Sequence, residues 1–203
     1  MTPSKRLFDV IVALVLGCIL LPFIVVIGII ILVLDGRPIF YVSERMRSPT
    51  QSFALVKFRT MKSATTDTGV TGGNKSNRIT RTGRFLRRTR LDEVPQIWNI
   101  LRGDISFVGP RPPLRQYVER FPDLYTEVLR ARPGVTGLAS IIYHRHEELL
   151  LGYCSTVEET DAVYSRACIP RKARLDLIYR ANRTICIDLI LMFKTVFRGL
   201  PLR

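Results

Sequence analysis

The first feature in the pattern of hydrophobic and polar positions is an uncharged apolar run from Val10 to Leu34. As a straight helix, this run would extend about 37 Å, which is longer than the hydrocarbon core of a bilayer, about 30 Å thick. The run is too long for the core of a signal peptide, and no small-residue cleavage site follows it. The pattern therefore predicts a membrane element that remains in the mature protein.

The placement of this run in a membrane has two interpretations. Pro22 lies at its centre, and a proline inside a helix removes a backbone hydrogen bond and kinks or breaks the helix. Basic residues flank both ends of the run, and the positive-inside rule draws both ends to the cytoplasmic face. These features fit a re-entrant hairpin, bent at its middle with both ends on one side of the membrane. A single span, oriented by the larger basic cluster downstream, fits the pattern equally well.

The rest of the chain has the pattern of a small domain of short strands and helices. Apolar stretches over 38–42 and 53–58 predict strands with a turn at Ser48-Pro49 between them, and the Thr-, Gly- and Ser-rich stretch 63–76 predicts a mobile loop. The stretch 107–113, FVGPRPP, cannot form a regular helix. Helices are expected over 91–101 with Gly103 as the C-cap, over 121–130, over 147–180 with a break at Pro170, and over 185–197. The last of these suits either the membrane interface or the core.

Composition adds a strong positive charge. Lys and Arg number 31 against 17 Asp and Glu, which gives a net charge of +14 at pH 7. Such a charge implies an anionic partner, which can be nucleic acid, an anionic leaflet or a phosphorylated substrate. The sequence contains neither a helix-turn-helix pattern nor an aromatic platform, so nucleic acid is not the expected partner.

Asp92 and Glu93 form an acidic pair at the start of the helix expected over 91–101. Asp92 is a good N-cap candidate, and capping alone would explain the pair. The alternative is chemistry: the positive end of a helix and the upstream arginines would keep a carboxylate ionised near neutral pH. An ionised Asp can attack a phosphorus atom, and a neighbouring Glu can hold Mg²⁺.

Basic side chains in loop-like sequence are the next candidates. Arg111, Arg132 and Arg145 each stand beside a proline, a glycine or a histidine. Each alone fits a surface charge, but together they fit a diphosphate substrate, because guanidinium binds phosphate in a bidentate manner. For His144 and His146, the roles of general base, phosphate contact and surface histidine all stay open.

Several sequence segments combine into a specific pattern. They are KRLFD at 5–9, KFRTM at 57–61, the stretch 87–93 that ends in LDE, NILRGDISFVGPRP at 99–112 and RPGVTG at 132–137. In their order and spacing, the chain resembles the bacterial sugar transferases, the monotopic phosphoglycosyl transferases that start glycoconjugate assembly. The LDE segment followed at this distance by GDxSxVGPRP carries most of the specificity.

The resemblance implies a membrane-associated α/β fold that is mainly helical. Residues 1–36 would form a re-entrant membrane helix broken near Pro22. Residues 37–203 would form a small cytoplasmic catalytic domain with short strands and interfacial amphipathic helices. The protein would then lie on the cytoplasmic face of the bacterial inner membrane, against its anionic leaflet. It would be of the small type, without the additional spans of larger members.

The resemblance also implies a ping-pong reaction. Asp92 would attack the β-phosphate of a nucleotide-diphosphate sugar, a UDP-sugar by family default, release UMP and carry the phosphosugar covalently. Polyprenyl (undecaprenyl) phosphate would then accept the phosphosugar, and Glu93 would ligate Mg²⁺. Lys57, Arg87 and Arg111 fall on the basic active-site positions of the family, and they join Arg132 and Arg145 as the expected contacts to substrate phosphate.

Other properties are not determined by the sequence. After PGVTG the chain continues as LASIIYHRHEE at 138–148, where many members of the family have a Trp and a polar stretch. This departure leaves the sugar and the role of Arg145 open. The nucleotide, the pathway served (O-antigen, capsule, exopolysaccharide or glycoprotein) and a homodimeric state are equally open.

Overall fold

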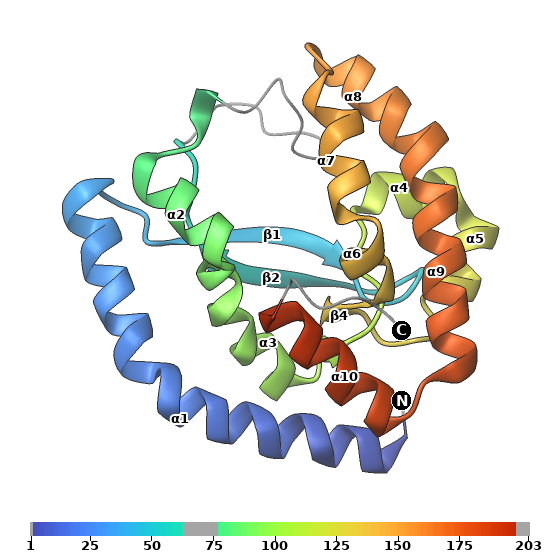
Figure 1. The fold of residues 1–203 in the computed structure, drawn as a ribbon, viewed down its shortest axis with the longest axis horizontal. Coiled ribbons are helices and arrows are strands. Elements are labelled where there is room, and N and C mark those ends of the chain that lie inside the picture. Colours follow the sequence, from blue (N-terminus) through green and yellow to red (C-terminus); the bar gives the residue numbers. More distant parts are fainter. Residues whose placement is uncertain (1, 63–76, 198–203) are drawn as a thin grey trace.

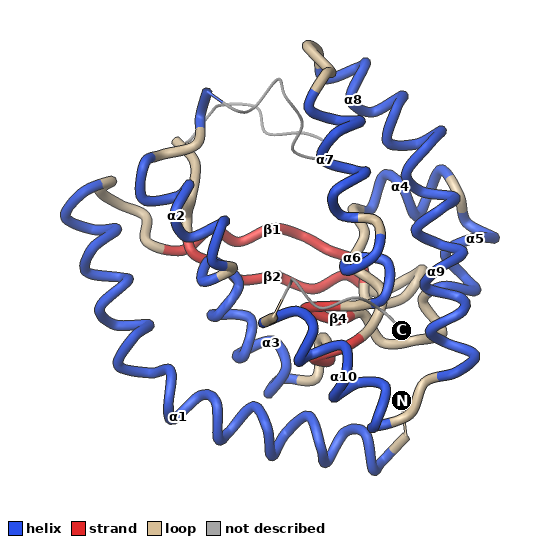
Figure 2. The backbone as a smooth tube through the Cα atoms, in the orientation of Figure 1, coloured by secondary structure: helices blue, strands red, loops and turns tan. Residues whose placement is uncertain are grey.

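The protein was analysed as a computed structural model, which describes residues 2–62 and 77–197. The loop expected over 63–76 lies outside the described residues. The fold is mainly helical, with helices arranged around short strands at the centre (Figures 1 and 2). In chain order the elements are α1 (Pro3–Leu34), β1 (Phe40–Met46), β2 (Ser52–Phe58), α2 (Arg81–Thr89), η2 (Leu91–Gln96), α3 (Ile97–Arg102), β3 (Ser106–Val108), α4 (Arg115–Arg120), α5 (Pro122–Val128), β4 (Gly134–Thr136), α6 (Leu138–Ile142), α7 (His144–Gly152), α8 (Val157–Val163), η3 (Tyr164–Cys168), α9 (Ile169–Asn182) and α10 (Ile185–Val196).

The apolar run forms helix α1, which continues through Pro22 without interruption. The expectation that the helix breaks near Pro22 is therefore wrong. The helix instead bends in its middle (Figure 1), as a helix does around an internal proline whose backbone cannot donate a hydrogen bond. Most of its large apolar side chains are exposed, including Val15, Phe23 and Val33. Among the described residues, α1 is the one helix long and apolar enough to cross a membrane.

Polar contacts fasten both ends of α1 to the remainder of the chain. Near its start, Lys5 Nζ lies 2.5 Å from Asp188 Oδ2 on α10, and Asp188 Oδ1 accepts a 2.6 Å hydrogen bond from the hydroxyl of Tyr179. Beyond its end, the guanidinium of Arg59 donates to the backbone carbonyls of Asp35, Gly36 and Arg37. The two ends of the bent helix are thus held by one folded body.

The strands form two small sheets. β1 and β2 make an antiparallel hairpin in which Phe40 pairs with Phe58 and Met46 with Ser52, so the two expected strands and the turn between them are confirmed. β3 and β4 pair in parallel, and at Gly134 an added Cβ would lie 2.2 Å from the backbone nitrogen of Gly109. Only glycine fits so close an approach of backbones, which explains why the PGVTG segment needs this residue.

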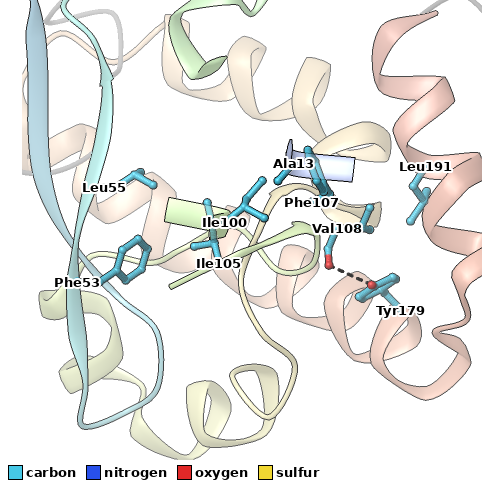
Figure 3. Close-up of a cluster of buried hydrophobic side chains, with 9 residues drawn as sticks. All are labelled: Ala13, Phe53, Leu55, Ile100, Ile105, Phe107, Val108, Tyr179 and Leu191. Atoms are coloured by element: carbon cyan, nitrogen blue, oxygen red, sulfur yellow. Dashed lines mark hydrogen bonds between the residues drawn. The ribbon is translucent and has the colours of Figure 1, made fainter. Parts of the chain in front are cut away.

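The main core lies where α1, β2, α3, β3 and α10 meet. Side chains from these elements and from α9 pack together in Figure 3, where the Tyr179 hydroxyl also donates to the carbonyl of Val108 at 3.1 Å. The buried members are Ala13, Phe53, Leu55, Ile100, Ile105, Phe107, Val108, Tyr179 and Leu191. This core joins helix α1 to the strands and fixes the chain segments that carry Glu93 and Arg111.

The helical expectations are met in part. The helix over 91–101 is divided into the 3-10 helix η2 and α3, and Gly103 ends it with φ +83°, as a glycine C-cap does. The stretch 107–113 contains no helix, as expected. A change of element falls next to Pro170, as expected: the π-helix η3 ends at Cys168, and α9 begins at Ile169 with this proline in its first turn, where its missing N–H is tolerated. A further interruption falls at 153–156, between α7 and α8.

Helix α10 contributes to the core, one of the two alternatives left open for 185–197. Asp188 and Leu191 are buried, whereas Leu189, Ile190 and Phe193 are exposed. Contact of this exposed face with the membrane interface stays a prediction.

Candidate active site

An open cleft of about 1490 Å³ is lined by side chains from both halves of the domain. One wall comes from β1, β2, α2 and η2, and the opposite wall comes from α6, α7 and α9. Six of the seven expected site residues line this one cleft, namely Lys57, Arg87, Asp92, Glu93, Arg111 and Arg145. Residues far apart in sequence are therefore brought together as a single basic site around an acidic pair.

Asp92 lies in the first turn of η2 and is only 7% exposed. It is not the N-cap, which corrects the expectation: Arg90 holds that position in a left-handed conformation with φ +61° and no side-chain cap. Burial, and then the charge of Glu93, raise the pKa of Asp92, although Lys57 and Arg87 act in the opposite direction. Desolvation therefore outweighs the nearby cations in setting the direction of this pKa, and ionisation of Asp92 near neutral pH stays a prediction.

Glu93 is held by two arginines. Both terminal nitrogens of Arg111 lie 3.3 Å from Glu93 Oε1, and Arg90 Nη1 lies 3.4 Å from Oε2. Burial would raise the pKa of Glu93, but Arg111, Arg90 and Lys57 outweigh it and leave the pKa lowered. The pKa values of the two adjacent carboxylates are thus shifted in opposite directions, and Glu93 is the more firmly ionised of the two. This pattern is typical of sites for acid and base chemistry.

Lys57 supplies a cation that can lose its charge. Its ammonium lies 5.2 Å from the centre of the Tyr41 ring, and burial beside Arg111 and Arg87 lowers its pKa to about 8. Arg87 donates from Nε to Thr60 Oγ1 at 2.8 Å, which fixes its guanidinium at the cleft wall. The positive charges of Lys57, Arg87 and Arg111 therefore lie close enough to disfavour one another, an arrangement suited to binding an anion.

The remaining basic candidates are placed differently. Arg145 is exposed on α7 and lines the cleft, as does His144, which contacts Glu148 at 3.3 Å. Arg132 is not brought to the cleft: its guanidinium donates to the carbonyl of Gly103, at the end of α3. His146 lies against Arg171, with 3.1 Å between their nitrogens.

Comparison of the sequence with known proteins identifies the family of the chain. The family model described as bacterial sugar transferase matches residues 1–201. The chain belongs to the bacterial sugar transferase family. The roles of the site residues expected from the resemblance stay predictions.

The names of the chain's relatives specify different sugars. The chain is 32% identical over 199 residues to the UDP-glucose:undecaprenyl-phosphate glucose-1-phosphate transferase of Klebsiella pneumoniae, covering 96% of this chain and 40% of the relative. It is 27% identical over 198 residues to a UDP-N-acetylgalactosamine-undecaprenyl-phosphate N-acetylgalactosaminephosphotransferase of Aeromonas hydrophila, covering 95% and 42%. The exopolysaccharide production protein ExoY of Sinorhizobium fredii is 31% identical over 210 residues, covering 95% and 84%. The chain spans about two fifths of the length of the first two relatives.

The two carboxylates of the cleft fit a metal ion that is also bound by the phosphates of a ligand. Among the described residues, no group of three or more His, Cys, Asp and Glu side chains could hold an ion by itself. Mg²⁺ is usually bound by one or two carboxylates together with substrate phosphates and water, and Asp92 and Glu93 provide such a pair. The residues present therefore fit Mg²⁺ only as a partner of the diphosphate.

The opposite wall of the cleft contains charged residues that sequence reasoning missed. Lys172 Nζ contacts both carboxylate oxygens of Glu147, at 2.9 and 3.0 Å, and Asp176 lies one turn further along α9. Both α9 residues are buried and line the cleft. The available signal was a Lys and an Asp four positions apart on an otherwise apolar helix face, with Ile169 and Ala173 beside them.

Proposed function

We propose that this protein transfers a sugar 1-phosphate from a UDP-sugar to undecaprenyl phosphate, as a step in the synthesis of a bacterial polysaccharide. The observation that carries the proposal is the acidic pair of buried Asp92 and half-buried Glu93 in one cleft with Lys57, Arg87 and Arg111. The relatives support it, because their names specify phosphosugar transfer from UDP-glucose or UDP-N-acetylgalactosamine to undecaprenyl phosphate.

The chemistry of the site would proceed in two displacements. A carboxylate oxygen of Asp92 attacks the β-phosphorus of the donor, and the bond between this phosphorus and the oxygen bridging to the α-phosphate breaks, so that UMP leaves. The sugar phosphate is then held as an acyl phosphate on Asp92. A phosphate oxygen of undecaprenyl phosphate attacks the same phosphorus, and the carboxylate of Asp92 is released. Lys57, Arg87 and Arg111 stabilise the charge on the phosphoryl oxygens in both displacements.

Glu93 is the residue of this chain that would hold Mg²⁺ together with the diphosphate. When bound, the metal supplies neutralisation of the diphosphate charge as UMP departs. Glu93 would exchange part of its contact with Arg111 for the ion, which frees this arginine to bind phosphate.

The membrane disposition proposed here is a re-entrant α1 with residues 37–203 on the cytoplasmic face. The support is that Lys5 and Arg59 fasten opposite ends of α1 to the same folded body, while the apolar side chains between them are exposed. A straight span would separate these ends by the thickness of the bilayer. Cysteines introduced at Ser4 and Arg37 should both react from the cytoplasmic side only, and reaction from opposite sides would exclude this arrangement.

The activity is tested with purified protein, Mg²⁺, undecaprenyl phosphate and a panel of UDP-sugars. We expect UMP release together with a lipid-linked diphosphosugar for at least one donor. The alternative is that the protein is a membrane scaffold that has the same fold but no catalytic activity. Absence of UMP release across a broad panel would support the scaffold and exclude the proposed transfer.

The pKa of Lys57 sets an expected limit at alkaline pH. A lysine with its pKa lowered to about 8 is charged below that pH and neutral above it, so kcat/KM for the donor should fall as pH rises through about 8. In Lys57→Arg this fall should disappear or move to higher pH, because arginine stays charged throughout. The measurement is the pH profile of UMP release for both proteins. Identical alkaline profiles would show that Lys57 does not set the limit.

A further inference from the structure

The cleft wall opposite Asp92 presents one face of helix α9. Ile169, Lys172, Ala173 and Asp176 all line the cleft, and their spacing of three and four places them on one side of the helix. Lys172 is 8% exposed and Asp176 is 6% exposed. Two charged side chains are thus buried on a helix face whose other two cleft-lining residues, Ile169 and Ala173, are apolar, and such groups require a partner.

Lys172 has hydrogen-bond partners within the protein, whereas one carboxylate oxygen of Asp176 has none among the described residues. Lys172 is bound by both oxygens of Glu147 and lies 5.1 Å from the centre of the Tyr164 ring. Oδ1 of Asp176 is buried, and among the described residues it has no hydrogen-bond partner. Burial raises the pKa of Asp176 to about 7, against the attraction of Lys172. A buried acceptor without a donor, at the surface of a substrate cleft, is suited to a donor from the ligand.

The position of this wall relative to the acidic pair agrees with such a ligand. Arg111 contacts Glu93 at 3.3 Å, and it is also close enough to Glu147 for the charge of that carboxylate to raise its pKa. Arg111 thus interacts electrostatically with both the acidic pair and Glu147, and all of these residues line the same cleft. In a nucleotide-diphosphate sugar, the sugar ring is attached to the phosphate that Asp92 would attack, so a donor bound at the acidic pair would place its ring in this cleft.

We propose that Asp176 accepts hydrogen bonds from hydroxyl groups of the donor's sugar ring, with Lys172 and Glu147 holding that wall in place, and thereby sets which sugar is accepted. This proposal rests on the proposed function. A carboxylate accepts bonds from two adjacent hydroxyls and so distinguishes sugars by the position of these groups. The ribose of the nucleotide also offers a pair of hydroxyls, and the experiment separates the two.

The test is Asp176→Asn, assayed with UDP-sugars that include deoxy analogues of the preferred donor. We expect kcat/KM for the preferred donor to fall about 10- to 100-fold, the loss typical of a hydrogen bond to a charged group. For the deoxy analogue that lacks the bound hydroxyl, wild type and variant should have equal kcat/KM. Inhibition by UMP, which contains the ribose but no sugar ring, should stay unchanged.

Asp123→Asn is the matched control, because Asp123 is an exposed aspartate on α5 outside the cleft. It should leave donor preference unchanged. The melting temperature of Asp176→Asn should equal or exceed that of wild type, because burying a neutral amide costs less free energy than burying a carboxylate. The proposal is overturned if Asp176→Asn keeps the wild-type preference, or if UMP inhibition weakens as much as donor use, which would assign the site to the ribose. A wild-type protein that releases no UMP with any donor would instead refute the proposed function.

Discussion

Asp92→Asn is expected to abolish phosphosugar transfer, with kcat reduced by about 10⁴-fold or more, as when an enzyme loses its nucleophile. The amide cannot form the acyl phosphate, while the cations around it remain. UMP release gives the rate, and the mass of the intact protein incubated with donor alone shows the covalent intermediate. Wild type should gain the mass of one sugar phosphate, and the variant should gain none.

Stability provides the control for this variant. The pKa of Asp92 is raised in the folded protein, so near neutral pH the ionised carboxylate is less favourable there than in the unfolded chain. The neutral amide removes this cost, and the melting temperature of Asp92→Asn should equal or exceed that of wild type at pH 7. Full turnover by the variant, or a covalent adduct still formed on it, would show that Asp92 is not the nucleophile. A large loss of melting temperature would assign the effect to folding.

Much of the architecture follows from local sequence. The apolar run predicts α1 because its length and lack of charge need no knowledge of neighbours. The strands of the β1–β2 hairpin follow from their apolar content, and Gly103 as a C-cap follows from the conformational freedom of glycine. The bend of α1 was also signalled by Pro22, although the chain stays helical through it.

The features that the sequence did not reveal depend on packing between distant segments. Asp92 was expected to be a helix cap, but η2 packs against β2 and buries it inside the first turn, and this burial decides the direction of its pKa. Asp176 and Glu147 lie on separate helices that meet only in the folded chain. Arg132 matched the family pattern, yet its contact with the carbonyl of Gly103 keeps it out of the cleft.

The second large effect is expected for Glu93→Gln. This substitution keeps the size of the side chain but removes its charge, which we propose is shared between Arg111 and Mg²⁺. We expect kcat to fall about 100-fold or more and the Mg²⁺ concentration needed for half-maximal activity to rise about tenfold. Effects of this size are typical when an enzyme loses a charged side chain that binds the metal or the transition state. Rates of UMP release across a Mg²⁺ titration at saturating donor give both values.

The stability of this variant should change in the sense opposite to that of Asp92→Asn. Arginines lower the pKa of Glu93 in the folded protein, so its charge stabilises the fold at neutral pH and this contribution is lost as pH falls through that pKa. Glu93→Gln should therefore melt lower than wild type at pH 7, with the difference shrinking in acid. Glu44→Gln, which loses an exposed pair with Arg115 at 2.5 Å outside the main cleft, is the control and should keep wild-type turnover. If Glu93→Gln were less stable yet showed the wild-type Mg²⁺ dependence, Glu93 would only position Arg111, and the metal would depend on Asp92 and the diphosphate alone.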